Sequence, residues 1–153
     1  MIAITTVGFG APEVVNVAPS DLYAFPEGLA GLEESHRYAL VSRPDAAPFQ
    51  WLQSLDESLV CLPVLRLDAV AAGQYAAAVA DVVGESEEAL RERVLIVARF
   101  DQVKGTFLVN LLAPIVLDSL QGTGKQVVLD GRGYALRQPI QWDPSARQFR
   151  LPC

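Results

Sequence analysis

Few residues in this chain could carry out nucleophilic or acid–base chemistry. His36 is the only histidine, so a Ser-His-Asp or Cys-His arrangement would have to be built on this one residue. No cluster of Cys, Asp or Glu stands at metal-ligand spacing around it. The inventory therefore argues against an enzyme and against a metal site, and we expect His36 to be a surface or half-buried side chain.

Other candidate motifs also have simpler interpretations. Glu33 and Glu34 are adjacent, and on an extended chain adjacent side chains point to opposite faces, which favours two solvated charges over a catalytic pair. The glycines in 121–126 fail the phosphate-loop pattern at both ends. Cys61 behaves as a small hydrophobe, and Cys153, the last residue, is expected to be disordered and without function. No cofactor and no small-molecule substrate are expected.

Charge is distributed unevenly along the sequence. Residues 1–92 carry 14 acidic and 4 basic side chains, net −10, and residues 93–153 are net +4. An acidic chain does not favour direct binding of nucleic acid, because neutralisation of phosphates supplies most of that affinity. The acidic half has two interpretations, solubility or attraction of a basic protein partner. For such a partner the candidate contact residues are Glu33, Glu34, Asp56 and Glu57.

Length and composition bound the class of protein. A chain of 153 residues that is 51% apolar can bury one substantial core, and we expect a single domain over residues 1–153. Its apolar runs are too short to cross a bilayer. The N-terminus has no signal-peptide pattern, so a cytoplasmic location without membrane contact is expected.

The apolar stretch Thr106–Val116 organises the predicted fold. Pro114 is unfavourable inside a helix but tolerated at a bulge or a sheet edge, so the stretch is predicted to be one buried strand. Asn110 interrupts it. We expect its amide to bond neighbouring backbone near Pro114, because an unpaired buried amide costs about 1–3 kcal/mol; a ligand contact is the alternative.

Turn residues delimit the other predicted elements. Pro26 and Gly28 predict a turn that needs positive φ, with Phe25 pinning the loop to the core. A short helix is expected over 85–93, capped by Ser86. Residues 68–80 could form another, weakened by Gly73. Residues 48–56 fit either a strand or a helical turn. Strands are expected at 14–17, 37–42, 59–67, 94–100, 126–129 and 134–137, with one more in the tail at 139–144.

This series of short strands lacks a βαβ rhythm. It predicts a mostly β fold, a small antiparallel barrel-like or sandwich-like β domain with one or two short helices. Phe25, Pro26, Gly28, Asn110 and Pro114 are expected to be structural residues of that fold.

Four segments together resemble the bacterial flagellar assembly factor FliW family. They stand in that family's order and spacing and cover about residues 14–137, whereas residues 68–80 depart from the pattern. The segments are FPEGLAG at 25–31, PFQWLQS at 48–54, TFLVNLLAPIV at 106–116 and GKQVVL at 124–129.

The resemblance implies a non-catalytic protein that binds flagellin in the cytoplasm. It also implies antagonism of the RNA-binding regulator CsrA, which couples flagellin translation to export. A sheet edge beside Pro63 or Pro114 is the candidate flagellin site. The alternatives are a chaperone or sheet-edge binding module for another secreted protein and, less favoured, a small enzyme.

Overall fold

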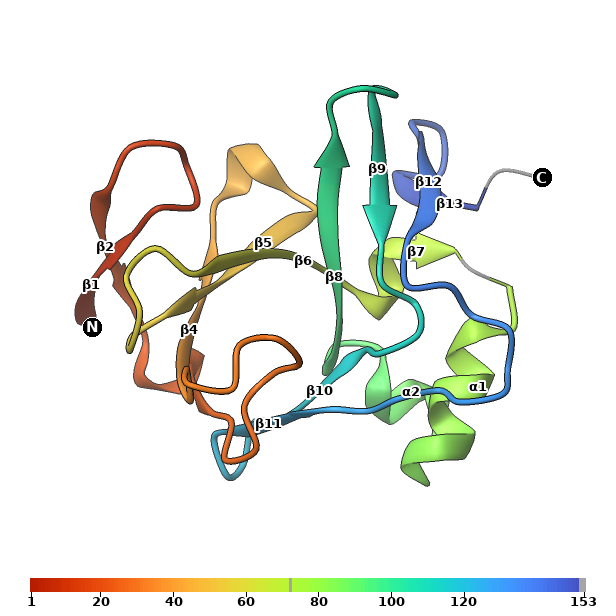
Figure 1. Cartoon of the computed structure of the whole chain (residues 1–153), viewed down its shortest axis with the longest axis horizontal. Coiled ribbons are helices and arrows are strands. Elements are labelled where there is room, and N and C mark those ends of the chain that lie inside the picture. Colours follow the sequence, from red (N-terminus) through yellow and green to blue (C-terminus); the bar gives the residue numbers. More distant parts are fainter. Residues whose placement is uncertain (72, 152–153) are drawn as a thin grey trace. The chain divides into compact units, whose positions relative to one another are not determined.

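The computed structural model in Figure 1 describes residues 1–71 and 73–151. The chain forms two compact units, Met1–Val64 with Leu117–Gln126, and Leu65–Val116 with Val127–Cys153. The chain therefore passes from one unit to the other three times. The prediction made for Cys153 lies outside the described residues.

The first unit is built on antiparallel strands and has its own apolar cluster. The hairpin of β1 and β2 forms a separate two-stranded sheet, and the other strands follow the order β11-β3-β4-β5. Ile4 and Val17 pack on Ala39 and Val41, which joins the hairpin to β4. The strands are β1 (Ile2–Thr6), β2 (Glu13–Val17), β3 (Leu22–Ala24), β4 (Arg37–Ser42), β5 (Phe49–Ser54) and β11 (Thr123–Gln126).

The second unit combines a sheet with two short helices. Its strand order is β8-β9-β12-β13-β7, and β10 pairs with β8. These elements are β7 (Val70–Ala71), β8 (Val94–Asp101), β9 (Thr106–Val109), β12 (Gln138–Asp143), β13 (Gln148–Arg150), α1 (Tyr75–Val83) and α2 (Glu87–Leu90). Strands β6 (Cys61–Arg66) and β10 (Ile115–Asp118) each include residues of both units. The 3-10 turns are η1 (Pro19–Asp21), η2 (Pro44–Ala46) and η3 (Leu67–Ala69).

The predicted fold class is confirmed. The protein is mostly β, most strand pairs are antiparallel, and the β10–β8 pairing closes the sheet as a barrel requires. The parallel pairs are β11 with β3 and β13 with β7. Helix α2 has the predicted cap, since Ser86 accepts a hydrogen bond from the Ala89 N–H at 3.2 Å. The ambiguous residues 48–56 form strand β5.

The predicted single strand over Thr106–Val116 is wrong. β9 ends at Val109 and β10 begins at Ile115. Between them the backbone leaves the ladder, because Pro114 has no N–H to donate and Asn110 closes a local turn. Both flanking strands are buried as expected.

Several boundaries also differ from the predictions. β11 covers 123–126 instead of 126–129, residues 134–137 form no strand, and the first strand is β1 at 2–6, ahead of 14–17. Pro63 does not mark a sheet edge, because β6 has a hydrogen-bonded neighbour on each side. The same holds for β10, which follows Pro114. The sheet-edge premise of the predicted flagellin site beside these prolines is therefore wrong.

Candidate functional site: an acidic surface on the first unit

Two buried serines bring the loop at 33–37 against the turn at 54–58. The hydroxyl oxygens of Ser35 and Ser54 lie 2.5 Å apart, and both residues are buried. The Ser54 hydroxyl also accepts the backbone N–H of Glu57 at 2.9 Å and of Asp56 at 3.1 Å. All four predicted contact residues, Glu33, Glu34, Asp56 and Glu57, are therefore held on two adjoining loops.

The Asp56 carboxylate is part of the frame that holds these loops. Its Oδ2 accepts the backbone N–H of His36 at 2.7 Å and of Arg37 at 2.9 Å. Its Oδ1 accepts from the Arg37 guanidinium at 2.8 and 3.0 Å. The backbone bond from His36, followed by the Arg37 side-chain bond, holds the pKa of Asp56 below its ordinary value. Asp56 therefore has less freedom than the glutamates to meet a partner.

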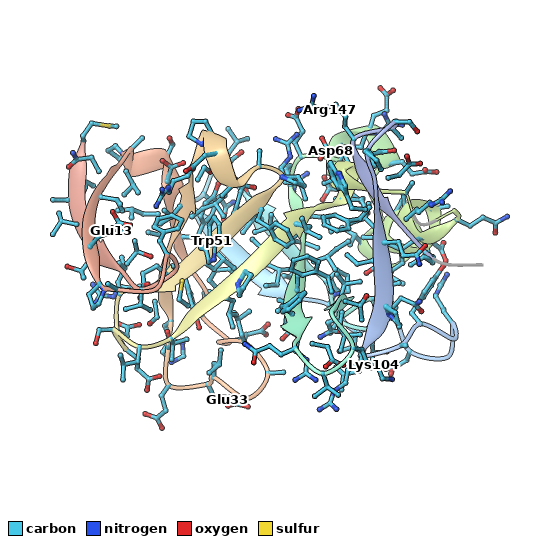
Figure 2. The ribbon with its side chains drawn as sticks, turned by 90° about the horizontal axis from the view of Figure 1, so that it is seen from above. Glu13, Glu33, Trp51, Asp68, Lys104 and Arg147 are labelled. Atoms are coloured by element: carbon cyan, nitrogen blue, oxygen red, sulfur yellow. The ribbon has the colours of Figure 1, made fainter. Side chains whose placement is uncertain are left out.

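Glu33, Glu34 and Glu57 are exposed, and none of them makes a salt bridge within the described chain. The Glu33 Oε1 accepts the Gly31 N–H at 3.1 Å. Figure 2 shows Glu33 at the rim of the first unit. These three carboxylates form what we call the acidic surface.

The loop at 25–28 supports the acidic surface from below. Phe25 is fully buried, and its carbonyl accepts the Gly28 N–H at 2.9 Å, which closes the predicted turn. Gly28 has φ +69°, and a Cβ there would lie 3.0 Å from the Glu33 Cα. Only glycine suits that position. His36 connects this loop to the turn at 54–58. Its backbone N–H donates to the Asp56 carboxylate, and its ring Nδ1 lies 3.0 Å from the Phe25 carbonyl oxygen.

Sequence analysis missed a buried amide beside this surface. The Gln53 Oε1 accepts from the Thr6 hydroxyl at 3.1 Å and the Val7 N–H at 2.9 Å. Its Nε2 donates to the carbonyls of Ser54, at 3.0 Å, and Val60, at 3.2 Å. The only signal in the sequence was the pair of glutamines, Gln50 and Gln53, among the apolar residues of β5. This network ties the turn at 54–58 to strand β1.

The segment Asn110–Pro114 lies in the second unit and is held by hydrogen bonds within that unit. The Asn110 Oδ1 accepts the Ala113 N–H at 3.0 Å, and the Leu111 carbonyl accepts the Tyr75 hydroxyl at 2.8 Å. Backbone N–H groups of Val127 and Leu129 donate to the carbonyls of Pro114 and Leu112. The geometry favours a structural role for Asn110 over a ligand contact.

The described residues offer no assembled metal site. No three His, Cys, Asp or Glu side chains within 1–71 and 73–151 gather to hold a metal ion. In that same part of the chain, no helix is both long enough and apolar enough to cross a membrane. A groove of about 350 Å³ lies in the second unit beside β7 and α1. Polar and small side chains make up most of its lining, among them Asp68, Glu87, Arg91 and Gln148.

The net charge is distributed unequally between the two units. The first unit carries nine acidic and three basic side chains, net −6, and the second carries nine of each. The acidic surplus of residues 65–92 is balanced by basic residues of the same unit. The whole net charge of −6 therefore belongs to the unit that bears the acidic surface.

Comparisons with known proteins agree on one family. A family model described as "FliW protein" matches residues 4–140. The flagellar assembly factor FliW of Leptospira biflexa serovar Patoc is 32% identical over 150 residues, with 91% of each chain covered. That of Thermosipho africanus is 27% identical, covering 82% of this chain and 89% of the relative. A crystal structure of the flagellar assembly factor FliW has a TM-score of 0.64 at 18% identity, over 90% of this chain and 95% of that one, which shows a shared fold.

Proposed function

Starting from the fact that this chain belongs to the FliW family of non-catalytic flagellar assembly factors, we propose that it binds flagellin in the cytoplasm and antagonises the RNA-binding regulator CsrA. Export of flagellin frees the protein, which then occupies the regulator and relieves repression of flagellin translation. It acts by binding other proteins through complementary shape and charge. The family membership confirms the resemblance found in the sequence.

The observation that carries the proposal for the regulator is the charge of the first unit. A regulator that binds RNA is expected to present basic side chains to phosphates. The first unit concentrates the net charge of −6. Its three glutamates without a salt bridge in the described chain, Glu33, Glu34 and Glu57, lie on adjoining loops. A bound acidic unit both attracts the basic regulator and repels phosphate near it.

Charge reversal on the acidic surface tests the proposal. The triple variant Glu33→Lys, Glu34→Lys and Glu57→Lys should weaken binding of purified CsrA about tenfold or more in calorimetry, because rim charges govern encounter and register. Asp56 is left unchanged, since its carboxylate holds the loops. The wild-type complex should also weaken as salt rises from about 0.05 to 0.5 M.

A matched control separates local from global charge. The variant Glu88→Lys, Glu92→Lys and Asp130→Lys makes the same change in net charge at exposed positions of the second unit. It should retain more of the affinity than the acidic-surface variant. Equal losses in both variants, or an affinity indifferent to salt, would show that the acidic surface is not the contact. Recovery of flagellin with the wild-type protein from a motile cell's cytoplasm tests the other partner.

A further inference from the structure

Four aromatic rings form a continuous strip across the sheet of the second unit. The ring centroids of Phe100 and Phe107 lie 5.0 Å apart, those of Phe107 and Phe149 5.6 Å, and those of Phe149 and Trp142 5.1 Å, all edge-to-face. Phe149 is buried, but Phe100 is 51% exposed and Trp142 43% exposed. Because each exposed ring packs on a neighbour, the aromatic strip presents rigid apolar surface to solvent.

The turns that border the aromatic strip lie at one end of the sheet. Strands β8, β9, β12 and β13 pair antiparallel in succession, so the β8–β9 turn and the β12–β13 turn fall at the same end. Figure 1 shows both turns there. The first turn also carries Val103, which is 96% exposed.

The border of the aromatic strip is positively charged. Lys104 and Arg147, which lie on the two turns, are exposed, and neither appears in a salt bridge in the described part of the chain. Arg99 and Arg150 adjoin Phe100 and Phe149 in their strands, so their side chains point to the opposite face of the sheet. The cationic border of the strip therefore consists of Lys104 and Arg147. Figure 2 shows Lys104 and Arg147 well apart on this unit. Residues 99–107 and 138–150 contain only two acids, Asp101 and Asp143, so their net charge is +2 in a protein of net charge −6.

The two acids are engaged in shaping the turns. The Asp101 Oδ1 accepts the Val103 N–H at 3.0 Å, and the Asp143 Oδ1 accepts the Ser145 hydroxyl at 2.7 Å. The hydrogen bond from the Ser145 side chain, followed by that from the Ala146 backbone, holds the pKa of Asp143 below its ordinary value. The carboxylates are therefore less available than the cations to an incoming partner.

The backbone conformation of Arg147 is a second, independent feature of this surface. Its φ is +53°, the one positive value at a non-glycine residue among those described. The left-handed region is sterically unfavourable for a residue with a Cβ, and glycine would avoid that cost. Backbone strain of this kind is concentrated at functional positions, and here it lies in the β12–β13 turn, two residues before Phe149 of the aromatic strip.

We propose that the aromatic strip and its cationic border bind an acidic, amphipathic polypeptide segment. Its aliphatic side chains would cover Phe100 and Trp142, and its carboxylates would pair with Lys104 and Arg147. Exposed rigid aromatic rings flanked by arginine are the residue types that anchor protein interfaces. An amphipathic segment supplies the matching apolar face and charge.

Two other occupants fit less well. Single-stranded RNA also binds aromatic and basic surfaces, but the net charge of −6 opposes phosphate, and two carboxylates border the strip. A second copy of this chain would bring its own cationic border against this one, which repels. The proposal is independent of the acidic surface, since it uses other residues of the opposite charge.

The test uses a fluorescein-labelled helical peptide of about 18 residues, with leucine at i, i+3, i+4 and i+7 spacing and glutamate elsewhere. Fluorescence anisotropy should detect binding to the full chain, and a lysine-for-glutamate peptide should bind about tenfold more weakly or not at all. Amide chemical shifts of the wild-type protein should change mainly in residues 99–107 and 138–150.

Variants identify the residues responsible. Phe100→Ala and Trp142→Ala should each weaken peptide binding about tenfold, whereas Leu136→Ala, at a 56% exposed leucine of the same unit, should leave it unchanged. Arg147→Gly removes the charge and the strain together, so this variant should melt at a higher temperature and yet bind the peptide more weakly. A loss of binding caused by misfolding could not give that pair of results.

Three results would overturn the proposal. The first is unchanged affinity in the Phe100, Trp142 and Arg147 variants. The second is stronger binding of a labelled single-stranded oligouridine than of the acidic peptide. The third is a concentration-dependent dimer in sedimentation that Trp142→Ala abolishes. None of these measurements involves CsrA, so failure here and failure of the acidic surface are separate outcomes.

Discussion

Asn110 has a side chain that stabilises a break between two strands. Its Oδ1 accepts the Ala113 N–H, so Asn110→Leu would remove that hydrogen bond. We expect the free energy of unfolding to fall by about 1–3 kcal/mol in urea denaturation. Asn16→Leu, at an exposed asparagine of β2, is the control and should change stability by less than about 0.5 kcal/mol. An Asn110 variant as stable as that control would contradict the structural role.

Asp56 gives the stability a specific dependence on pH. Its pKa is lowered in the folded protein by the His36 backbone bond and then by Arg37. The ionised carboxylate therefore stabilises the fold fully above the unfolded pKa of about 3.9, and this contribution disappears as pH falls through the lower folded value.

The pH dependence is measured against a variant. The unfolding free energy of wild type should exceed that of Asp56→Asn near neutral pH, and the difference should shrink as the pH is lowered below about 4. Glu57→Gln, which loses an exposed neighbouring carboxylate, serves as the control and should show a smaller difference. A constant gap between wild type and Asp56→Asn at all pH values would contradict this account.

At the scale of elements, strand β11 fits beside the 25–28 loop because Gly124 has no side chain. A Cβ at Gly124 would lie 2.5 Å from two carbons of the buried Phe25 ring. Gly124→Ala should therefore reduce the free energy of unfolding by about 1–3 kcal/mol through overpacking. Its φ is not in the left-handed region, so the cost is steric alone.

A double-mutant cycle checks that cause. Phe25→Leu creates room, and Gly124→Ala should cost clearly less in that background than in wild type, with a coupling of about 0.5–3 kcal/mol. Additive effects of the two changes in chemical denaturation would show that the ring is not what Gly124 accommodates.

The whole molecule should unfold as one cooperative unit, as the prediction of a single domain over residues 1–153 requires. The chain passes between the two units three times, so neither unit is one continuous segment able to fold without interruption. Trp51 lies in the first unit and Trp142 in the second. In Trp142→Phe and Trp51→Phe proteins, the remaining tryptophan should report coincident urea midpoints. Midpoints that differ would instead indicate two separately folding domains.

Local sequence pattern predicted an element correctly where the element's own residues determine its structure. The alternating or continuous apolar runs of β4 and β8, the Ser86 cap of α2 and the turn at Gly28 were each predicted from neighbours in sequence. The prediction failed at Asn110–Pro114, because the groups that satisfy this segment come from Tyr75, Val127 and Leu129. No window of local sequence contains them.

The sequence by itself determined the fold class and the family, because periodicity, turn residues and motif order are properties of the linear chain. Only the tertiary structure decided which charges stand together. It fixed Asp56 as a structural carboxylate, assigned the net charge of −6 to one unit and aligned four aromatic rings from four strands. These features depend on strand register and long-range hydrogen bonds, and such pairings are set by packing between segments distant in sequence.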